Sequence, residues 1–174
     1  ETQVISASTL IQKAKMKLIM QKIAAESKPD TILNNIIVID FATRKIAAGE
    51  KGYLEKGQTL IDGLDYEGAV KTFERVISKS KNPQLPMIAI GCVRFTQGKY
   101  VKSVEAFTRA VDYLASLQVA APHPEDGHTA YHNRALANFR DGNDAGGITD
   151  LESALALKDG TAIRELLVIC LRRM

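Results

Sequence analysis

An internal repeat with a period of 34 residues constrains this chain more than any other feature of its sequence. Small and aromatic side chains return at that interval in two consecutive segments. The matching pairs are Gly57 and Gly91, Tyr66 and Tyr100, Ala69 and Ser103, and Phe73 and Phe107. A unit of this length cannot bury its apolar face alone, whereas a stack of such units can. The repeat therefore predicts an array of similar supersecondary units.

A third and less regular copy follows the first two. Its members are Tyr131, Ala135, Gly147, Leu151 and Ala154. Ala135 lies 44 residues beyond Gly91, which is more than one period. The extra residues fall at 118–127, where two prolines and a glycine indicate a loop between repeats.

These units resemble the tetratricopeptide repeat (TPR), whose two antiparallel helices are joined by a Gly-Asp-Tyr-like turn. The resemblance covers about residues 50–158 and implies an all-α superhelix with three hairpins, at about 50–83, 84–117 and 128–158. Three positions depart from the family pattern. Asp144 replaces the turn tyrosine, Leu151 replaces an aromatic residue, and Val76 replaces the usual alanine.

The repeated residues are expected to hold the hairpins together. Small residues at Gly57, Gly91 and Ala135 would let paired helices approach closely, and the aromatic residues would fill the space between neighbouring hairpins. The full set of expected structural positions is Gly57, Tyr66, Ala69, Phe73, Gly91, Tyr100, Phe107, Ala110, Ala135, Gly147 and Ala154.

Both flanks of the repeats are expected to be helical. Residues 1–49 would form an N-terminal extension with helices at 9–25 and 30–48, and residues 159–174 a C-terminal capping helix. The run Ile36-Ile37-Val38-Ile39 also fits a strand by propensity, but an all-helical neighbourhood favours helix. The last helix is apolar nearly all round at 166–171, which indicates either ordinary burial or contact with a partner chain or the groove.

The TPR resemblance implies that the first helix of each hairpin lines a concave channel that binds another protein. Helical spacing places eleven candidate residues there: Glu55, Gln58, Asp62, Ile88, Cys92, Phe95, Thr96, Thr129, His132, Asn133 and Arg140. The centre of this surface is apolar and would be costly to leave wet. We therefore expect a hydrophobic peptide or helix, or a terminal helix of the chain itself, to cover it.

One subset of the family binds the C-terminal carboxylate of heat-shock chaperones through Lys, Asn and Arg residues on these inner faces. The corresponding positions here are Leu54, Gln58, Ala89, Thr129 and Asn133. Because two carboxylates need cationic and amide donors, this composition disfavours a chaperone-tail adaptor.

The sequence offers little for catalysis, cofactors or metals. His128 and His132 have the spacing of a metal pair, but no glutamate lies between them, so surface histidines are favoured. Residues 141–152 imitate a calcium loop in which Ala145 removes a ligand. A phosphate-binding glycine loop, a nucleophile elbow and a carboxylate pair are all absent from the sequence, so we expect neither an enzyme nor a cofactor.

The charge and the cysteine content limit which partners and which compartment are expected. The net charge of +3 is too small to indicate a nucleic-acid surface, although five lysines within residues 1–28 leave contact with an acidic partner or an anionic membrane open. Cys92 and Cys170 do not form a disulfide framework, which favours a reducing compartment such as the cytoplasm, plastid stroma or mitochondrial matrix. The first residue is Glu1, as expected if a leader or a longer N-terminal part has been removed.

The function predicted from the sequence is that of a non-enzymatic TPR scaffold or adaptor in a multiprotein complex. A permanent structural subunit of a large complex is the first alternative, and a helical-repeat RNA binder is a less favoured one.

Overall fold

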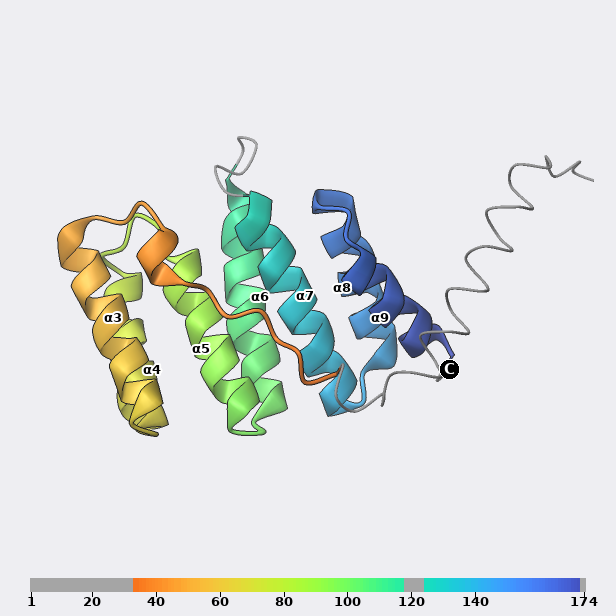
Figure 1. The fold of residues 1–174 in the computed structure, drawn as a ribbon, viewed down its shortest axis with the longest axis horizontal. Coiled ribbons are helices and arrows are strands. Elements are labelled where there is room, and N and C mark those ends of the chain that lie inside the picture. Colours follow the sequence, from red (N-terminus) through yellow and green to blue (C-terminus); the bar gives the residue numbers. More distant parts are fainter. Residues whose placement is uncertain (1–32, 118–123, 173–174) are drawn as a thin grey trace, which may run out of the picture.

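A computed structural model describes residues 33–117 and 124–172, and this part of the chain is all-α, as predicted. Figure 1 shows its seven α-helices and one short 3-10 helix in an elongated, sequential array. The elements are η1 (Phe41–Thr43), α3 (Ala48–Asp62), α4 (Tyr66–Ile77), α5 (Gln84–Thr96), α6 (Tyr100–Ser116), α7 (Pro124–Asp141), α8 (Asp144–Leu157) and α9 (Thr161–Leu171).

Consecutive helices form three antiparallel hairpins: α3 with α4, α5 with α6, and α7 with α8 (Figure 1). α7 begins at Pro124, four residues before the predicted start, so the connecting loop is shorter than expected. Proline is well tolerated at the first position of a helix, and acidic side chains in the first turn, here Glu125 and Asp126, stabilise its positive end. The sequence prediction had assigned these residues to the loop.

Each hairpin turn has the same hydrogen-bonded geometry. In the first turn the N–H of Leu64 donates to Ile61 and that of Asp65 donates to Leu60, and the other two turns repeat the pattern. This pair of bonds is the Schellman motif, which places one residue in the left-handed region. Gly98 and Gly142 occupy that position with φ of 70° and 86°, but in the first hairpin it is Leu64, with φ of 62°.

The repeated glycines lie directly beneath aromatic rings of the same hairpin. A Cβ added at Gly57 would overlap the ring of Phe73, and one added at Gly91 would overlap Phe107. In the third hairpin the two roles change helices, because Phe139 of α7 covers Gly147 of α8. Phe73 and Phe107 therefore fill the gap within each hairpin, which corrects the prediction that they lie between hairpins.

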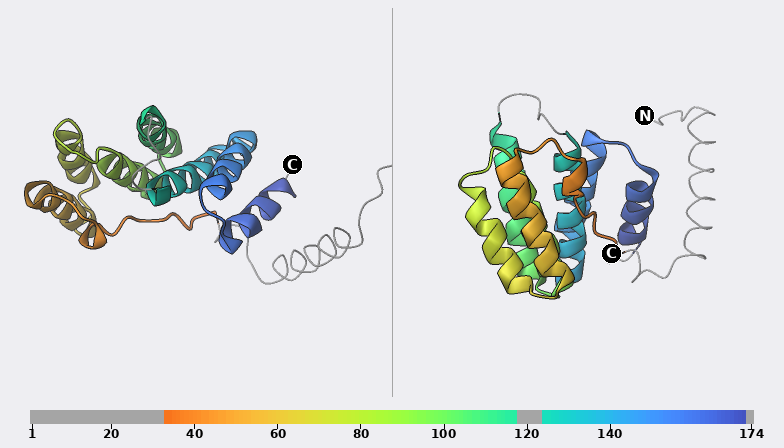
Figure 2. Two further views of the ribbon diagram at one scale, coloured as in Figure 1. Left: turned by 90° about the horizontal axis from the view of Figure 1, so that it is seen from above. Right: turned by 60° about the vertical axis from the view of Figure 1, so that its left-hand side comes forward.

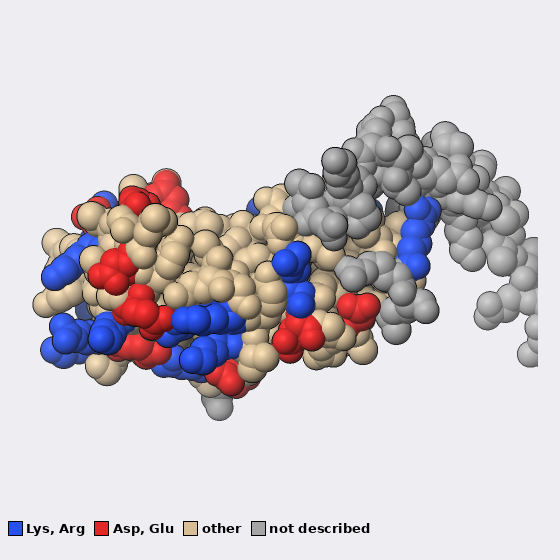
Figure 3. Space-filling view, turned by 90° about the horizontal axis from the view of Figure 1, so that it is seen from below, with Lys and Arg blue, Asp and Glu red and all other residues tan. Residues whose placement is uncertain are grey.

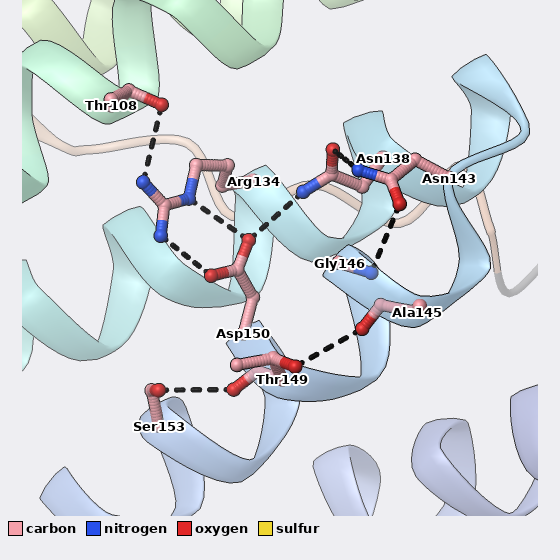
Figure 4. Close-up of polar contacts among 9 residues, drawn as sticks. All are labelled: Thr108, Arg134, Asn138, Asn143, Ala145, Gly146, Thr149, Asp150 and Ser153. Carbon is pink, nitrogen blue, oxygen red and sulfur yellow. Dashed lines mark hydrogen bonds and ion pairs between the residues drawn. The ribbon is translucent and has the colours of Figure 1, made fainter.

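A polar cluster joins the two helices of the third hairpin, as Figure 4 shows. The guanidinium of Arg134 donates to both carboxylate oxygens of Asp150, at 2.9 and 2.6 Å, and to the hydroxyl of Thr108 at 3.1 Å. Asn138 donates to the same carboxylate at 3.0 Å. Since Asp150 is 4% exposed, these bonds compensate a buried charge.

The C-terminal helix α9 packs on α8 and buries one face, as a capping helix does. Ile163, Leu166, Ile169 and Cys170 are buried, and Leu171 is 53% exposed. Burial within the chain therefore accounts for most of the apolar run at 166–171.

Residues 33–47 are not the helix that the sequence predicted. Apart from the 3-10 turn η1, this stretch is extended and irregular. The segment is held extended by the helices beneath it, because main-chain groups of Asn35 and Ile37 are hydrogen-bonded to side chains of α7. The helix expected at 9–25 and the lysines of residues 1–28 lie outside the described residues.

Candidate protein-binding channel

The three first helices of the hairpins lie on one side of the molecule, and the three second helices on the other. In the left-hand view of Figure 2, the extended segment of residues 33–44 follows the side of α3, α5 and α7. This side is the channel in which the sequence placed its candidate residues. Within the described residues, the channel is thus covered by the chain itself, through the extended segment of residues 33–44.

Asn133 of α7 binds the main chain of this segment as a neighbouring strand would. Its side-chain oxygen accepts the N–H of Ile37 at 2.7 Å, and its side-chain nitrogen donates to the carbonyl of Ile37, also at 2.7 Å. The Asn133 side chain is completely buried, so the two bonds satisfy polar groups that would otherwise be desolvated without partners. Cys92 of α5 lies against the same carbonyl, with its sulfur 3.7 Å from the oxygen.

His132, which precedes Asn133 in α7, contacts the main chain of Asn35, two residues before Ile37. Its Nε2 lies 3.2 Å from the carbonyl oxygen of Asn35, and its Nδ1 is buried with no partner among the described residues. Burial lowers the pKa of His132, although the Asn35 carbonyl opposes the shift, and nearby His128 lowers it further. The ring is therefore held neutral, donating from Nε2 to Asn35.

Apolar side chains anchor the segment on either side of these polar contacts. Leu33, Ile39 and Phe41 are at most 8% exposed and belong to the core. The Phe41 ring lies 6.3 Å from that of Phe73, within the range of favourable aromatic contact. In contrast, the Ile37 and Val38 side chains are 36% and 62% exposed.

An ion pair fixes the C-terminal end of the segment to the start of α7. Arg44 donates to Glu125 at 2.9 Å and, more closely, to Asp126, which is completely buried. Gln84 of α5 donates to the other oxygen of Asp126 at 3.2 Å. Loss of Arg44 would leave a buried carboxylate with one neutral donor, so this contact is the firmest polar anchor of the segment.

The segment leaves two hollows beside it. One of about 290 Å³ is lined by Asn34, Ile36, Phe95, Thr96 and Tyr100. Another of about 350 Å³ is lined by residues 38–42 together with Glu55 and Gln58 of α3. The channel can therefore hold more side-chain volume than residues 33–44 provide.

The predicted channel residues fall into four groups. Cys92, His132 and Asn133 contact the segment, and Glu55, Gln58, Phe95 and Thr96 line the hollows. Ile88 and Thr129 are buried in the core. Asp62 accepts a hydrogen bond from Gln58 at 2.9 Å, and Arg140 donates to the Tyr100 hydroxyl at 2.7 Å and lies over its ring.

Phe95 also makes a contact within its own hairpin. Its ring meets that of Tyr100 edge-on at 5.3 Å, and the side chain is 6% exposed. It therefore packs within the hairpin while one side lines the hollow next to Ile36.

Sequence reasoning missed the segment itself and the residues that hold its end. Asn35, Ile37 and Arg44 were assigned to a helix, and Asp126 was assigned to a loop. The usable signals were the strand propensity of the isoleucine run and the acidic pair directly after Pro124, at the start of a helix.

The histidines and the cysteine of the channel show no reactive arrangement. His128 Nδ1 lies 3.1 Å from the carbonyl of Ala154, so its ring and that of His132 contact different elements. No group of three possible metal-binding side chains occurs within 33–117 and 124–172. Burial raises the pKa of Cys92 to about 12, so its thiol stays protonated.

Surface charges are mixed in sign. Figure 3 shows Lys and Arg side chains interspersed with Asp and Glu along the edge that carries the hairpin turns. Glu67 illustrates the pairing, because hydrogen bonds from Arg94 and Lys99 hold the pKa of its carboxyl well below the usual range. No helix in the described parts of the chain is both long and apolar enough to span a bilayer.

Comparison with solved structures places this architecture among known domains. The first TPR domain of Spaghetti (RPAP3), bound to the HSP90 peptide SRMEEVD, superposes with a TM-score of 0.59 and 16% identity over 71% of this chain and 91% of that one. The Sgt2 TPR domain from Aspergillus fumigatus superposes with a TM-score of 0.60 and 13% identity, over 74% of this chain and 80% of that one. The chain has the TPR fold.

The second TPR domain of human RPAP3, in complex with the HSP70 peptide SGPTIEEVD, is similar at a TM-score of 0.54 and 21% identity, over 67% of this chain and 91% of that one. The sequence matches no family model and no curated protein at a significant level. TPR domains are generally protein-interaction modules.

Proposed function

We propose that this protein is a non-catalytic TPR scaffold whose channel binds an extended segment of a partner within a multiprotein assembly. The observation that carries the proposal is the pairing of Asn133 with both main-chain groups of Ile37. A side-chain amide that pairs with an N–H and a carbonyl of one residue recognises extended backbone in general. The channel thus has the chemistry of a peptide-binding site.

The partner segment in this proposal is not an acidic C-terminal tail of the kind bound to the RPAP3 domains. At the positions where a carboxylate clamp would lie, Leu54, Ala89 and Thr129 are at most 9% exposed. Asn133 is engaged with the chain's own backbone. A terminal carboxylate would therefore meet few of the charged donors it needs.

Position-dependent photo-crosslinking tests the proposed function. A photoreactive amino acid at Thr96, which lines the channel, is expected to crosslink a partner protein. The same group at Val101, 56% exposed at the start of α6, serves as the control on the other layer of helices. Equal crosslinking of the same partner from both positions would contradict binding in the channel.

A permanent structural subunit is the second candidate, and the first hairpin favours it. A hollow of about 480 Å³ lies at the start of α3 and the end of α4, lined by Gly49, Glu50, Tyr53, Arg75, Val76, Ser78 and Lys79. Tyr53 is 56% exposed there. Neighbouring units of a solenoid cover such faces. Crosslinks from Tyr53, with none from Thr96, would favour this alternative.

An RNA-binding role receives less support. Arg94 and Lys99, near the second hairpin turn, are paired with Glu67, and the cations do not form an uninterrupted positive surface in Figure 3. Counterion release from a phosphate backbone requires cations that are available for it. RNA affinity that falls steeply with salt would overturn this ranking.

A further inference from the structure

We propose that residues 33–38 act as an intramolecular stand-in for the partner peptide, which displaces them from α5 and α7 while Arg44 stays bound as a latch. The displacing ligand is an internal, extended and uncharged apolar segment of another protein. This inference rests on the proposed function, because it assigns the ligand class and the competition at the same channel.

The contacts of residues 33–38 with α7 can be exchanged because they involve main-chain groups. Asn133 pairs with the N–H and carbonyl of Ile37, and His132 contacts the carbonyl of Asn35. Every extended peptide offers the same N–H and carbonyl groups. The exposed side chains of Ile37 and Val38 contribute little to holding this part in place, and an apolar side chain of the ligand would replace the buried Leu33.

The second part of the segment differs, because a charged side chain holds it in addition to a buried aromatic ring. Phe41 is buried against Phe73, and Arg44 neutralises the buried carboxylate of Asp126. Releasing Arg44 would leave that carboxylate desolvated and uncompensated. The segment is therefore expected to open from residue 33 towards residue 38 while residues 41–44 remain attached.

The polar groups that contact residues 35–37 define the charge of the ligand. Asn133 is an amide, Cys92 is a protonated thiol, and His132 is a neutral ring with its unpartnered Nδ1 buried. A ligand carboxylate placed against these groups would lose water without gaining a cationic partner. An uncharged stretch of main chain pairs with Asn133 and with Nε2 of His132 without burying a charge.

The hollow beside Ile36 defines the side chain that a stronger ligand would carry. About 290 Å³ remains between Ile36 and the Phe95, Thr96 and Tyr100 side chains. A phenylalanine at the place of Ile36 would fill more of this space and bury more apolar area. Such a peptide should displace the chain's own segment more readily than a copy of that segment.

The alkylation rate of the Cys92 thiol measures whether the segment is docked, and this measurement needs no partner protein. Cys92 lies beneath Ile37 and is 7% exposed, whereas Cys170 of α9 is 1% exposed and far along the chain. An alkylating reagent followed by mass spectrometry gives both rates in the full-length chain. Cys170 serves as the internal control, because it is buried in α9 and does not line the channel.

Ile37→Pro is the first test variant, since it deletes the N–H that Asn133 accepts while replacing an exposed side chain. Val38→Pro is the matched control, because the Val38 N–H donates to no group among the described residues. We expect Cys92 alkylation to rise about tenfold or more in Ile37→Pro, as for local opening. Val38→Pro should keep the wild-type rate, and Cys170 should be unchanged in both variants.

A peptide with the uncharged sequence of residues 33–38, blocked at both ends, then tests replacement. It should bind Ile37→Pro about tenfold more tightly than wild type, because the intramolecular competitor is weakened, and restore protection of Cys92. Its variant with Phe in place of Ile36 should bind more tightly still, and SRMEEVD should not bind. In a double variant that adds Asn133→Ala, circular dichroism should show the same helix content while the peptide no longer protects Cys92.

Three results would overturn the inference: equal Cys92 rates in Ile37→Pro and Val38→Pro, equal peptide affinity for wild type and Ile37→Pro, or a wild-type dimer that exchanges residues 33–38 between copies. Failure of the proposed function is distinguishable. In that case Cys92 protection would depend on Ile37 as expected, but partner crosslinks would come from outside the channel.

Discussion

Two interfaces on the same helices differ in what holds them together. Within each hairpin, a glycine lies under an aromatic ring, and buried polar groups such as Asp150 are fully paired by side chains. Between the channel and residues 33–38, the hydrogen bonds go to main-chain groups, Leu33 is buried, and the Ile37 and Val38 side chains remain exposed. The first interface depends on the shape of particular residues, whereas the second depends mainly on main-chain groups that any uncharged extended segment offers. This difference suits a rigid scaffold that carries an exchangeable segment.

The comparison is tested most strongly at Asp150, in the interface between α7 and α8. Asp150→Ala removes the partner of Arg134, whose side chain is 18% exposed, and is expected to destabilise the fold by about 3–5 kcal/mol. Chemical denaturation measures this effect. Glu74→Ala, which removes the surface pair with Arg109, is the control and should cost less than about 1 kcal/mol. A cost for Asp150→Ala as small as that of the control would remove the distinction between the interfaces.

Gly91→Leu tests the close approach of α5 and α6. The new side chain would collide with the Phe107 ring, so overpacking is expected to cost about 1–3 kcal/mol. Gly52→Ala in α3 is the matched control, because a Cβ there meets nothing within 4 Å and alanine favours helix by about 1 kcal/mol. The melting temperature should fall for Gly91→Leu and rise for Gly52→Ala. An unchanged value for Gly91→Leu would show that the hairpin is not tightly closed.

The pH dependence of segment docking tests the same comparison at the channel. Burial lowers the pKa of His132 below its ordinary value of 6.5, so the docked state binds fewer protons than the released state. Docking should therefore be strongest above about pH 6.5 and weaken as the pH falls below it.

Hydrogen exchange at the Ile37 amide measures this effect after correction for the intrinsic rate. Protection should fall between about pH 7.5 and pH 5.5 in the wild type and stay constant in His132→Gln, which keeps a donor for Asn35. Amides in the middle of α5 should not respond. A parallel loss of protection in both regions would mean that segment and scaffold open together.

Leu64→Gly has the smallest expected effect. Leu64 adopts a left-handed conformation and is 71% exposed, so the substitution relieves backbone strain with little loss of apolar burial. Net stabilisation of about 0.5–1 kcal/mol is expected, because the added freedom of glycine in the unfolded chain offsets part of the gain. Gly98→Ala at the equivalent turn should have the opposite sign. Thermal unfolding of both variants checks the pair.

The sequence predicted the helices well where local and repeated signals agreed. Starts and ends near Tyr66, Tyr100 and Asp144 follow the turns that recur in every copy, and the capping residues Asp65 and Asn143 are visible in the sequence. The predicted channel helices are also those that residues 33–44 cover. Whether Glu55, Gln58, Thr96 and their neighbours bind a partner stays a prediction.

The failures share a physical cause. The isoleucine run at 36–39 fits helix or strand by local propensity, and contacts with Asn133 and His132, about 96 residues away in sequence, hold it extended. In the same way, Asp126 is found to be an anchor only once Arg44 and Gln84 are beside it. Long-range polar pairs leave no periodic trace in a single sequence.

The sequence by itself determined a stack of helical hairpins, because small and aromatic residues at a fixed spacing allow only close helix pairs to bury them. Only the tertiary structure decided what covers the channel. Two buried groups select the segment that binds there: the amide of Asn133, which needs two hydrogen-bond partners, and the carboxylate of Asp126, which needs a cation. Residues 33–44 supply both, because the fold brings them to the side of α5 and α7.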